Sequence, residues 1–153
     1  MIDLRPVMTY RLEVSGPLTS SDGSEPDPHR QYWQMTKATL DGDGIRATTP
    51  MPGIDWFTPH SSNIGRPHVR IPFQTDDGAL ILMEYRGIVQ ATEAFNRAVK
   101  SNTATRWEDQ YMRMALMFDT MSVKYAWLVQ HLFLARGRLL AAKTIEYEVY
   151  CVE

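Results

Sequence analysis

Apolar and polar residues alternate at both ends of the chain, a pattern typical of half-buried β-strands. Over residues 7–14, one face carries Met8, Tyr10, Leu12 and Val14. Over residues 144–152, one face carries Ile145, Tyr147, Val149 and Cys151. Because both ends are predicted to be strands, we expect them to lie close together, as in a closed barrel.

Two hairpins are predicted between these terminal strands. Residues 32–40 and 45–49 flank the turn at 41–44, and residues 69–74 and 79–86 flank the turn at 76–78. Both turns contain an Asp-Gly dipeptide, which is a strong hairpin signal. Pro72 cannot donate a backbone hydrogen bond and therefore predicts an edge or a bulge. Residues 111–118 and 131–139 are predicted to be further strands, with a tight segment at 125–128 between them.

One segment follows helical spacing instead. Apolar residues recur on one face of residues 92–100, and Thr92 is a suitable N-cap for a short helix there. The polar segments 16–30 and 58–67 are predicted loops. The first is long for a compact domain and is therefore expected to be mobile or to act as a lid.

Many short strands without α/β alternation predict a mainly β fold. We expect a single antiparallel β-barrel of about 8–10 strands with one short helix. A chain of 153 residues is long enough to bury a core, and we expect residues 1–153 to form a single domain.

Composition narrows the function classes. The formal charge is −2 and no basic run occurs, so no nucleic-acid partner is expected. No apolar stretch approaches the roughly 20 residues that span a bilayer, and residues 1–10 lack a signal-peptide pattern. We therefore expect no membrane partner and a cytoplasmic location. Cys151 is the only cysteine, which excludes an intrachain disulfide and argues against a cysteine-based metal site.

The candidate chemistry centres on His68 and Arg70, because no phosphate-binding, nucleophile-elbow or metalloprotease motif occurs. These two residues lie two apart on a predicted strand and therefore share a face. If that face lines the lumen, Arg70 would hold an oxyanion while His68 or Asp55 moves a proton. Buried charges need partners, and those available are Asp55, Asp77 and Glu84. The alternative is that this polar face looks at solvent.

Aromatic and methionine side chains are the candidate walls of a ligand pocket. Trp56, Trp127 and Tyr85 could stack on a flat ligand, although aromatic residues are more often core mass. Four methionines cluster at positions 112, 114, 117 and 121, and Met114 is one candidate wall residue. The alternative for this cluster is ordinary core filling.

Five ordered segments of the sequence resemble the family known as domain of unknown function 3237. They are Gly53-Ile54-Asp55-Trp56, His68-Val69-Arg70, residues 75–81, Tyr125-Ala126-Trp127-Leu128 and Tyr147-Glu148-Val149-Tyr150. The resemblance implies a lipocalin-like or calycin-like β-barrel. It also implies that Asp55, Trp56, Arg70, Asp77 and Trp127 stand at recurring positions and that Arg70 faces the lumen. The chain departs from the family pattern at His68, where an acid is usual.

Three functions follow from these readings. The preferred hypothesis is an enzyme of isomerase, cyclase or lyase type that needs no metal or organic cofactor and acts on an aromatic or polyketide-like molecule in the lumen. Its expected catalytic residues are His68, Arg70, Asp55 and Glu84, and its expected substrate-binding residues are Trp56, Tyr85, Trp127, Met114 and Asp77. The alternatives are a non-catalytic binding protein for a small apolar ligand and a side-chain-filled barrel with a structural role. Small barrels of this kind are commonly homodimers, but nothing in the sequence fixes the oligomeric state.

Overall fold

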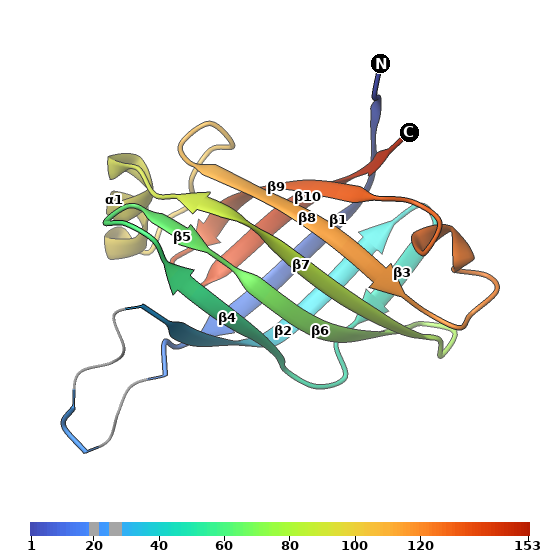
Figure 1. Cartoon of the computed structure of the whole chain (residues 1–153), viewed down its shortest axis with the longest axis horizontal. Coiled ribbons are helices and arrows are strands. Elements are labelled where there is room, and N and C mark those ends of the chain that lie inside the picture. The colour runs from blue at the N-terminus through green and yellow to red at the C-terminus, as the bar shows by residue number, and fades with distance from the viewer. Residues whose placement is uncertain (19–21, 25–28) are drawn as a thin grey trace.

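The computed structural model describes residues 1–18, 22–24 and 29–153, and within them it forms ten strands, one α-helix and one short 3-10 helix (Figure 1). The strands are β1 (Leu4–Ser15), β2 (Gln31–Gly42), β3 (Ile45–Thr48), β4 (Gly53–Pro59), β5 (Ile64–Arg66), β6 (His68–Thr75), β7 (Leu80–Gln90), β8 (Tyr111–Asp119), β9 (Phe133–Ala141) and β10 (Thr144–Val152). The helices are α1 (Glu93–Ser101) and η1 (Ala126–Leu128). The predicted loop at 16–30 lies partly outside the described residues, and its described parts form no strand or helix.

The strands close into an antiparallel barrel, which confirms the predicted fold class. The terminal strands β1 and β10 pair along their length, from Leu4 opposite Val152 to Glu13 opposite Thr144. The other edge of β1 pairs with β2, and this contact completes the ring. Both predicted hairpins form, as β2–β3 and β6–β7. In the described part of the chain, no helix is long and apolar enough to cross a bilayer.

The wall between β4 and β7 differs from the prediction. The predicted loop at 58–67 contains the end of β4 and the whole of β5, which pair with each other. These pieces are too short to show alternation, so sequence patterning misses them. Pro72 lies between the β4 pairing, which ends at Arg70, and the β3 pairing, which starts at Gln74. Its missing donor therefore falls at a local edge of β6, as its position in the sequence predicts.

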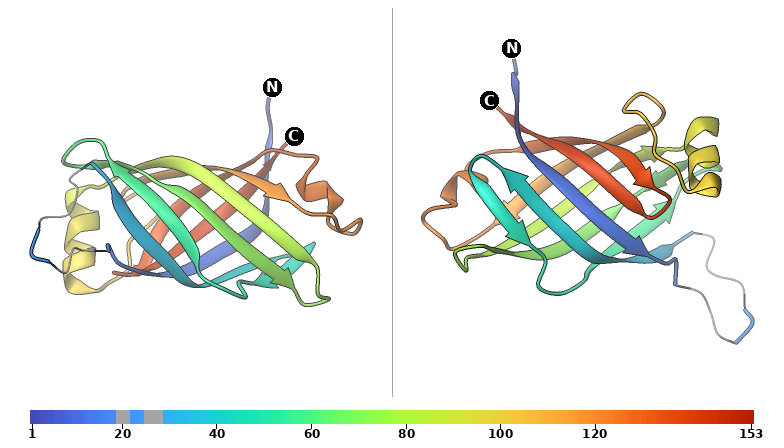
Figure 2. Two further views of the ribbon diagram at one scale, coloured as in Figure 1. Left: turned by 60° about the horizontal axis from the view of Figure 1, so that its bottom comes forward. Right: turned by 180° about the vertical axis from the view of Figure 1, so that it is seen from behind.

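The two ends of the barrel are covered by different elements. Figures 1 and 2 show α1 lying across one end and the η1 segment at the other. Thr92 caps α1 as predicted, because its hydroxyl accepts a hydrogen bond from the backbone N–H of Phe95. At the η1 end, Phe133 packs edge-on against Phe118 and Trp127, with ring centroids 5.1 and 5.8 Å away. Leu128 is fully buried there, so side chains fill this end of the lumen.

The lumen is the hydrophobic core of the protein. Successive side chains of a strand point to opposite faces, and on every long strand the apolar set points inward. On β6 the inward set is Val69, Ile71 and Phe73, which are at most 2 % exposed. On the outside, ion pairs link neighbouring strands, as where Glu146 on β10 lies between Arg11 on β1 and Arg138 on β9.

The inward and outward assignment of the β6–β7 hairpin can be tested by paired truncations. We expect Phe73→Ala to lower the free energy of unfolding by about 3–5 kcal/mol, because it opens a cavity in the packed lumen. Leu80→Ala, on the outer face of β7, should cost less than about 1 kcal/mol. Urea denaturation followed by circular dichroism measures both. Equal losses for the two variants would show that the faces are wrongly assigned.

Candidate functional site

The His68/Arg70 face of β6 lies on the outside of the barrel, so the expectation that it lines the lumen is wrong. The Arg70 side chain is 75 % exposed. Both residues bind Glu84 on β7, with His68 Nε2 2.9 Å from Glu84 Oε1 and Arg70 Nε 3.2 Å from Glu84 Oε2. The hydrogen bond from His68 and the Arg70 charge lower the pKa of Glu84. The physical reason for the error is that a small barrel uses its lumen as the core, where these charged groups would lose their hydration.

Three further residues of the expected site, namely Trp56, Trp127 and Asp77, also lie outside the part of the lumen that is next to α1. Trp56 follows Asp55 on β4 and points outward, with 49 % of its surface exposed. Trp127 lies at the η1 end against Phe133. Asp77 sits in the β6–β7 turn, where its carboxylate accepts hydrogen bonds from Thr75, Tyr125 and Lys124. Its role is therefore to tie the turn to the η1 segment, and these bonds lower its pKa.

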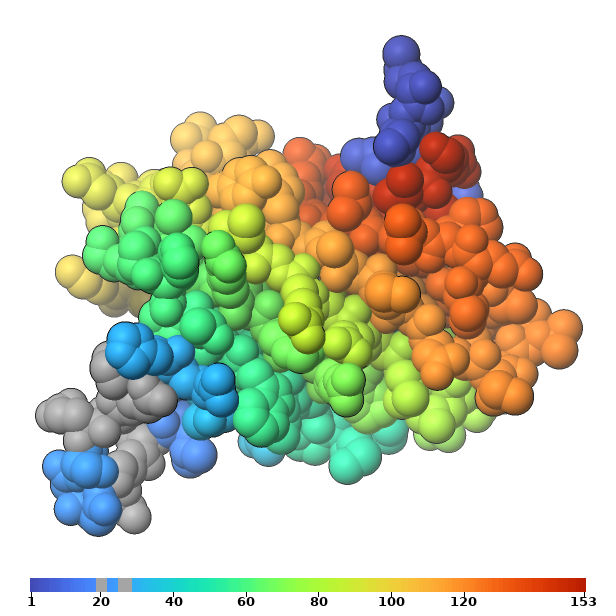
Figure 3. Space-filling view, viewed as in Figure 1, coloured from blue at the N-terminus to red at the C-terminus, as the bar shows by residue number. Residues whose placement is uncertain are grey.

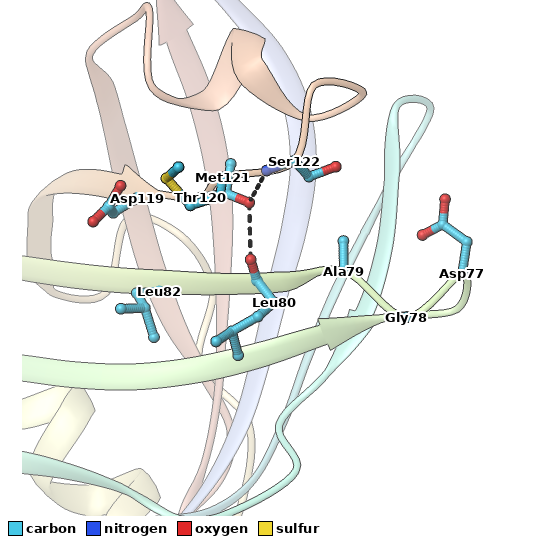
Figure 4. A pocket seen from close by; sticks show the side chains of 9 residues that line it. All are labelled: Asp77, Gly78, Ala79, Leu80, Leu82, Asp119, Thr120, Met121 and Ser122. Atoms are coloured by element: carbon cyan, nitrogen blue, oxygen red, sulfur yellow. Dashed lines mark hydrogen bonds between the residues drawn. The ribbon is translucent and has the colours of Figure 1, made fainter.

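A hollow beside this turn is one candidate for a binding site outside the lumen (Figure 4). Thr120 links two segments that line this hollow. The Thr120 hydroxyl donates a hydrogen bond to the Leu80 carbonyl (2.8 Å) and accepts one from the Ser122 N–H (3.1 Å). The Asp77 carboxylate is already bound by Thr75, Lys124 and Tyr125. Asp77 and Thr120 thus use their polar groups to hold the chain.

A second cavity, inside the lumen next to α1, brings together buried polar groups and apolar walls. It has a volume of about 420 Å³, which suits a small organic ligand. Its walls come from strands on both sides of the barrel and from α1, and they include Trp33, Phe57, Phe95 and Met112. We call this space the lumen cavity.

Asp55 is the acid of the lumen cavity. It lies opposite Val69 in the β4–β6 pairing, so it shares the inward face of that residue and is 8 % exposed. Oδ1 accepts a hydrogen bond of 3.0 Å from the backbone N–H of His68. Oδ2 has no hydrogen-bond partner among the described residues, and the carboxylate borders the cavity. Burial raises the pKa of Asp55 to about 6, although the His68 N–H partly opposes this.

Three tyrosines, Tyr10, Tyr85 and Tyr147, form a layer across the lumen, and two of them, Tyr85 and Tyr147, line the cavity. The Tyr10 and Tyr85 hydroxyls are 3.3 Å apart, and the Tyr147 ring stacks on Tyr10 with centroids 5.6 Å apart. Burial and the neighbouring Asp55 charge raise the pKa of Tyr85 and of Tyr147 well above 10. Both phenols are therefore neutral hydrogen-bond donors. The Tyr147 hydroxyl has no hydrogen-bond partner among the described residues.

Of the residues expected in the site, the structure thus brings Asp55 and Tyr85 together at the lumen cavity. Met114 lies against the tyrosine layer but does not line the lumen cavity, and the methionine cluster divides between the inside and the outside of the barrel. Tyr147 and Tyr10 were missed, since they stand on the apolar faces of the two terminal strands and look like core residues. Their approach to Asp55 depends on pairings between distant parts of the chain.

The charges of the lumen cavity limit what it can hold. Its lining contains the Asp55 carboxylate and no Lys, Arg or His within the described residues. A ligand anion would therefore meet no opposite charge, whereas a neutral ligand with a carbonyl or hydroxyl could bind the phenols. Over the described ranges, no group of three or more His, Cys, Asp or Glu side chains is arranged to hold a metal ion.

The buried carboxylate of Asp55 should make stability depend on pH. Its pKa is raised from 3.8 to about 6 by folding, so the folded state holds a proton that the unfolded chain releases between these values. The free energy of unfolding therefore falls as pH rises through this window, by about 3 kcal/mol from this residue. Asp55→Asn should remove that fall and be more stable than the wild type at pH 8.

Urea denaturation of both proteins at pH 4 and pH 8 measures this difference. Asp119→Asn, which replaces an exposed acid on β8, is the matched control and should keep the wild-type pH dependence. The same pH dependence in Asp55→Asn and in the wild type would mean that the carboxylate is not buried.

Comparisons with known proteins agree with this fold. The model of the family described as "Protein of unknown function (DUF3237)" matches residues 2–152. A UPF0311 protein from Clostridium acetobutylicum is 30 % identical over an alignment of 110 residues, and the match covers 68 % of this chain and 66 % of that protein. The match thus covers about two thirds of the length of this curated relative.

Two solved structures show how far the fold extends. A conserved protein of unknown function from Rhodopseudomonas palustris is 21 % identical with a TM-score of 0.84, covering 100 % of this chain and 98 % of that one. An enzyme from Penicillium herquei is 19 % identical with a TM-score of 0.68, covering 99 % of this chain and 95 % of that one. At these identities the likeness concerns the barrel alone. The family match over almost the whole chain shows more: this protein belongs to the DUF3237 family of proteins of unknown function.

Proposed function

We propose that the lumen cavity binds a small neutral molecule, aromatic or polyketide-like, and moves a proton on it without a metal or organic cofactor. The observation that carries this proposal is Asp55. One of its oxygens is held by a backbone N–H, the side chain lines the cavity, and its pKa is raised to about 6. A carboxylate prepared in this way suits general base catalysis near neutral pH.

The proposed reaction is isomerisation through an enol. The free oxygen of Asp55 takes a proton from the carbon that lies between a carbonyl group and a C=C bond. The electron pair of that C–H bond forms a new C=C bond, and the π pair of the carbonyl group moves onto its oxygen. Asp55 then returns the proton to a different carbon, so no co-reactant is consumed. In this proposal the hydroxyl of Tyr147, a residue that lines the cavity, donates a hydrogen bond to the developing oxyanion.

The substrate class follows from the walls of the cavity. Aromatic rings and apolar side chains dominate the lining, and no cation of the described chain lies among them to attract an anion. A volume of about 420 Å³ is within the usual range for small-ligand sites, roughly 300–1,000 Å³. These features favour a flat, uncharged ketone or lactone over a charged metabolite.

The comparison with the Penicillium herquei protein gives this proposal modest support. That protein is described as an enzyme and has the same barrel over nearly its full length. At 19 % identity it lends plausibility to catalysis in this fold and says nothing of the substrate. The second candidate is a non-catalytic binding protein, favoured by the mainly apolar lining of a cavity that lies behind α1.

Exchange of substrate hydrogen for deuterium separates these two functions. Aromatic ketones and lactones that raise the melting temperature are incubated with the protein in D₂O, and mass spectrometry follows deuterium uptake next to the carbonyl. We expect uptake to depend on a deprotonated group with a pKa of about 6, so its rate rises with pH to a plateau above that value.

Variants locate the chemistry. Asp55→Asn should slow exchange by about 10²–10⁴-fold and Tyr147→Phe by about 10²–10³-fold. His68→Ala, on the outer wall, should keep a rate within a few-fold of the wild type. Ligand binding without any exchange would favour the binding protein, and a lost activity in His68→Ala with an active Asp55→Asn would contradict the assignment of the base.

A further inference from the structure

A second hollow lies on the outer wall of the barrel, over β4, β5, β6 and β7, and it is rich in arginine. These strands face the reader in Figure 3, coloured in shades of green. The hollow has a volume of about 700 Å³. We call it the outer groove, and its principal side chains are Arg30, Trp56, Arg66, His68, Arg70 and Arg86.

Strand register places these side chains together. Trp33, Asp55, Val69 and Tyr85 lie opposite one another across β2, β4, β6 and β7, and their side chains point inward. The residues next to them in sequence form the outward-facing pairs Tyr32–Trp56 and His68–Arg86. Because the inward row is fixed by the packed lumen, its neighbours on each strand must point outward. The outer groove is thus separated from the lumen cavity by the thickness of the sheet.

The charge of the outer groove is unbalanced. Glu84 is the acid that faces it among the described ion pairs, and it binds both His68 and Arg70. No described residue forms an ion pair with Arg66 or Arg86. Guanidinium groups stay charged at all ordinary pH values, and like charges on neighbouring strands repel each other. Arg66 and Arg86 therefore have no ion-pair partner within the described protein, although the chain as a whole carries a net charge of −2.

Trp56 adds a flat apolar surface at the same place. Its indole is half exposed and is held by an edge-to-face contact with Tyr32, with ring centroids 5.1 Å apart. A fixed, exposed indole beside arginine is the combination that stacks on the base of a nucleotide while guanidinium groups bind its phosphates.

We propose that the outer groove binds a nucleoside diphosphate or a closely similar phosphorylated aromatic molecule. Arg66 and Arg86 bind the phosphates, and Trp56 stacks on the base. A small ligand fits better than an acidic peptide, because the groove has the volume of a small-molecule site. This site is independent of the chemistry in the lumen.

Isothermal titration calorimetry with ADP tests the outer groove. We expect saturable binding that weakens as salt rises. Arg66→Gln and Arg86→Gln should each weaken ADP binding by about tenfold or more, since each removes charge-assisted hydrogen bonds. Trp56→Leu should weaken the binding of ADP by about five- to 100-fold but leave the binding of pyrophosphate unchanged, because only ADP carries a base.

Arg46→Gln, an exposed arginine on β3 outside the groove, is the matched control and should bind ADP as the wild type does. Circular dichroism melting confirms that each variant is folded. The proposal is overturned by an absence of ADP binding at millimolar concentration, or by binding that Arg66→Gln and Arg86→Gln leave unchanged. It is overturned equally if adenosine or a hexaglutamate peptide binds as tightly as ADP.

Discussion

The register between β4 and β6 decides what this barrel can do. Residues that lie opposite each other in a sheet share a face, so the pairing of Asp55 with Val69 carries the carboxylate into the lumen. The same register sends Trp56 and His68 outward. A shift by one residue would reverse every one of these positions. The lumen cavity and the outer groove are therefore two consequences of one pairing, on the two sides of the same wall.

An enclosed carboxylate is costly for a barrel whose lumen is otherwise apolar. Asp55 gains one hydrogen bond from the His68 backbone, which offsets part of the lost hydration but leaves its pKa well above the ordinary value. A residue with only a packing role would be better replaced by an apolar one. Its side chain lines a space large enough for a small ligand, beside phenols that remain neutral. The proposed proton transfer rests on these features.

Local patterns in the sequence predict a large part of the fold. Alternation at the two ends predicts β1 and β10, Asp-Gly turns predict both hairpins, and Thr92 marks the start of α1, all as found. β4 and β5 are not predicted, because a short strand shows too few alternations. Their pairing nevertheless builds the wall that carries Asp55.

The site was harder to predict because it depends on which face of β6 looks inward. The sequence already holds the answer in Val69, Ile71 and Phe73, since a narrow barrel must fill its lumen with apolar side chains. The resemblance to a known family favoured Arg70 instead. The convergence of Asp55 with Tyr147 could not be predicted from local patterns, because it joins β4 to β10 across the barrel.

The central claim is that the Asp55 carboxyl is enclosed in the lumen, and its own titration tests this most directly. Carbon-13 NMR of the aspartate carboxyl groups, with Asp55→Asn to identify the signal, follows that titration in the intact protein. The structure predicts a midpoint near pH 6. A midpoint near 3.8, the ordinary value for an aspartate, would show that the carboxyl is in contact with bulk water and would contradict the account.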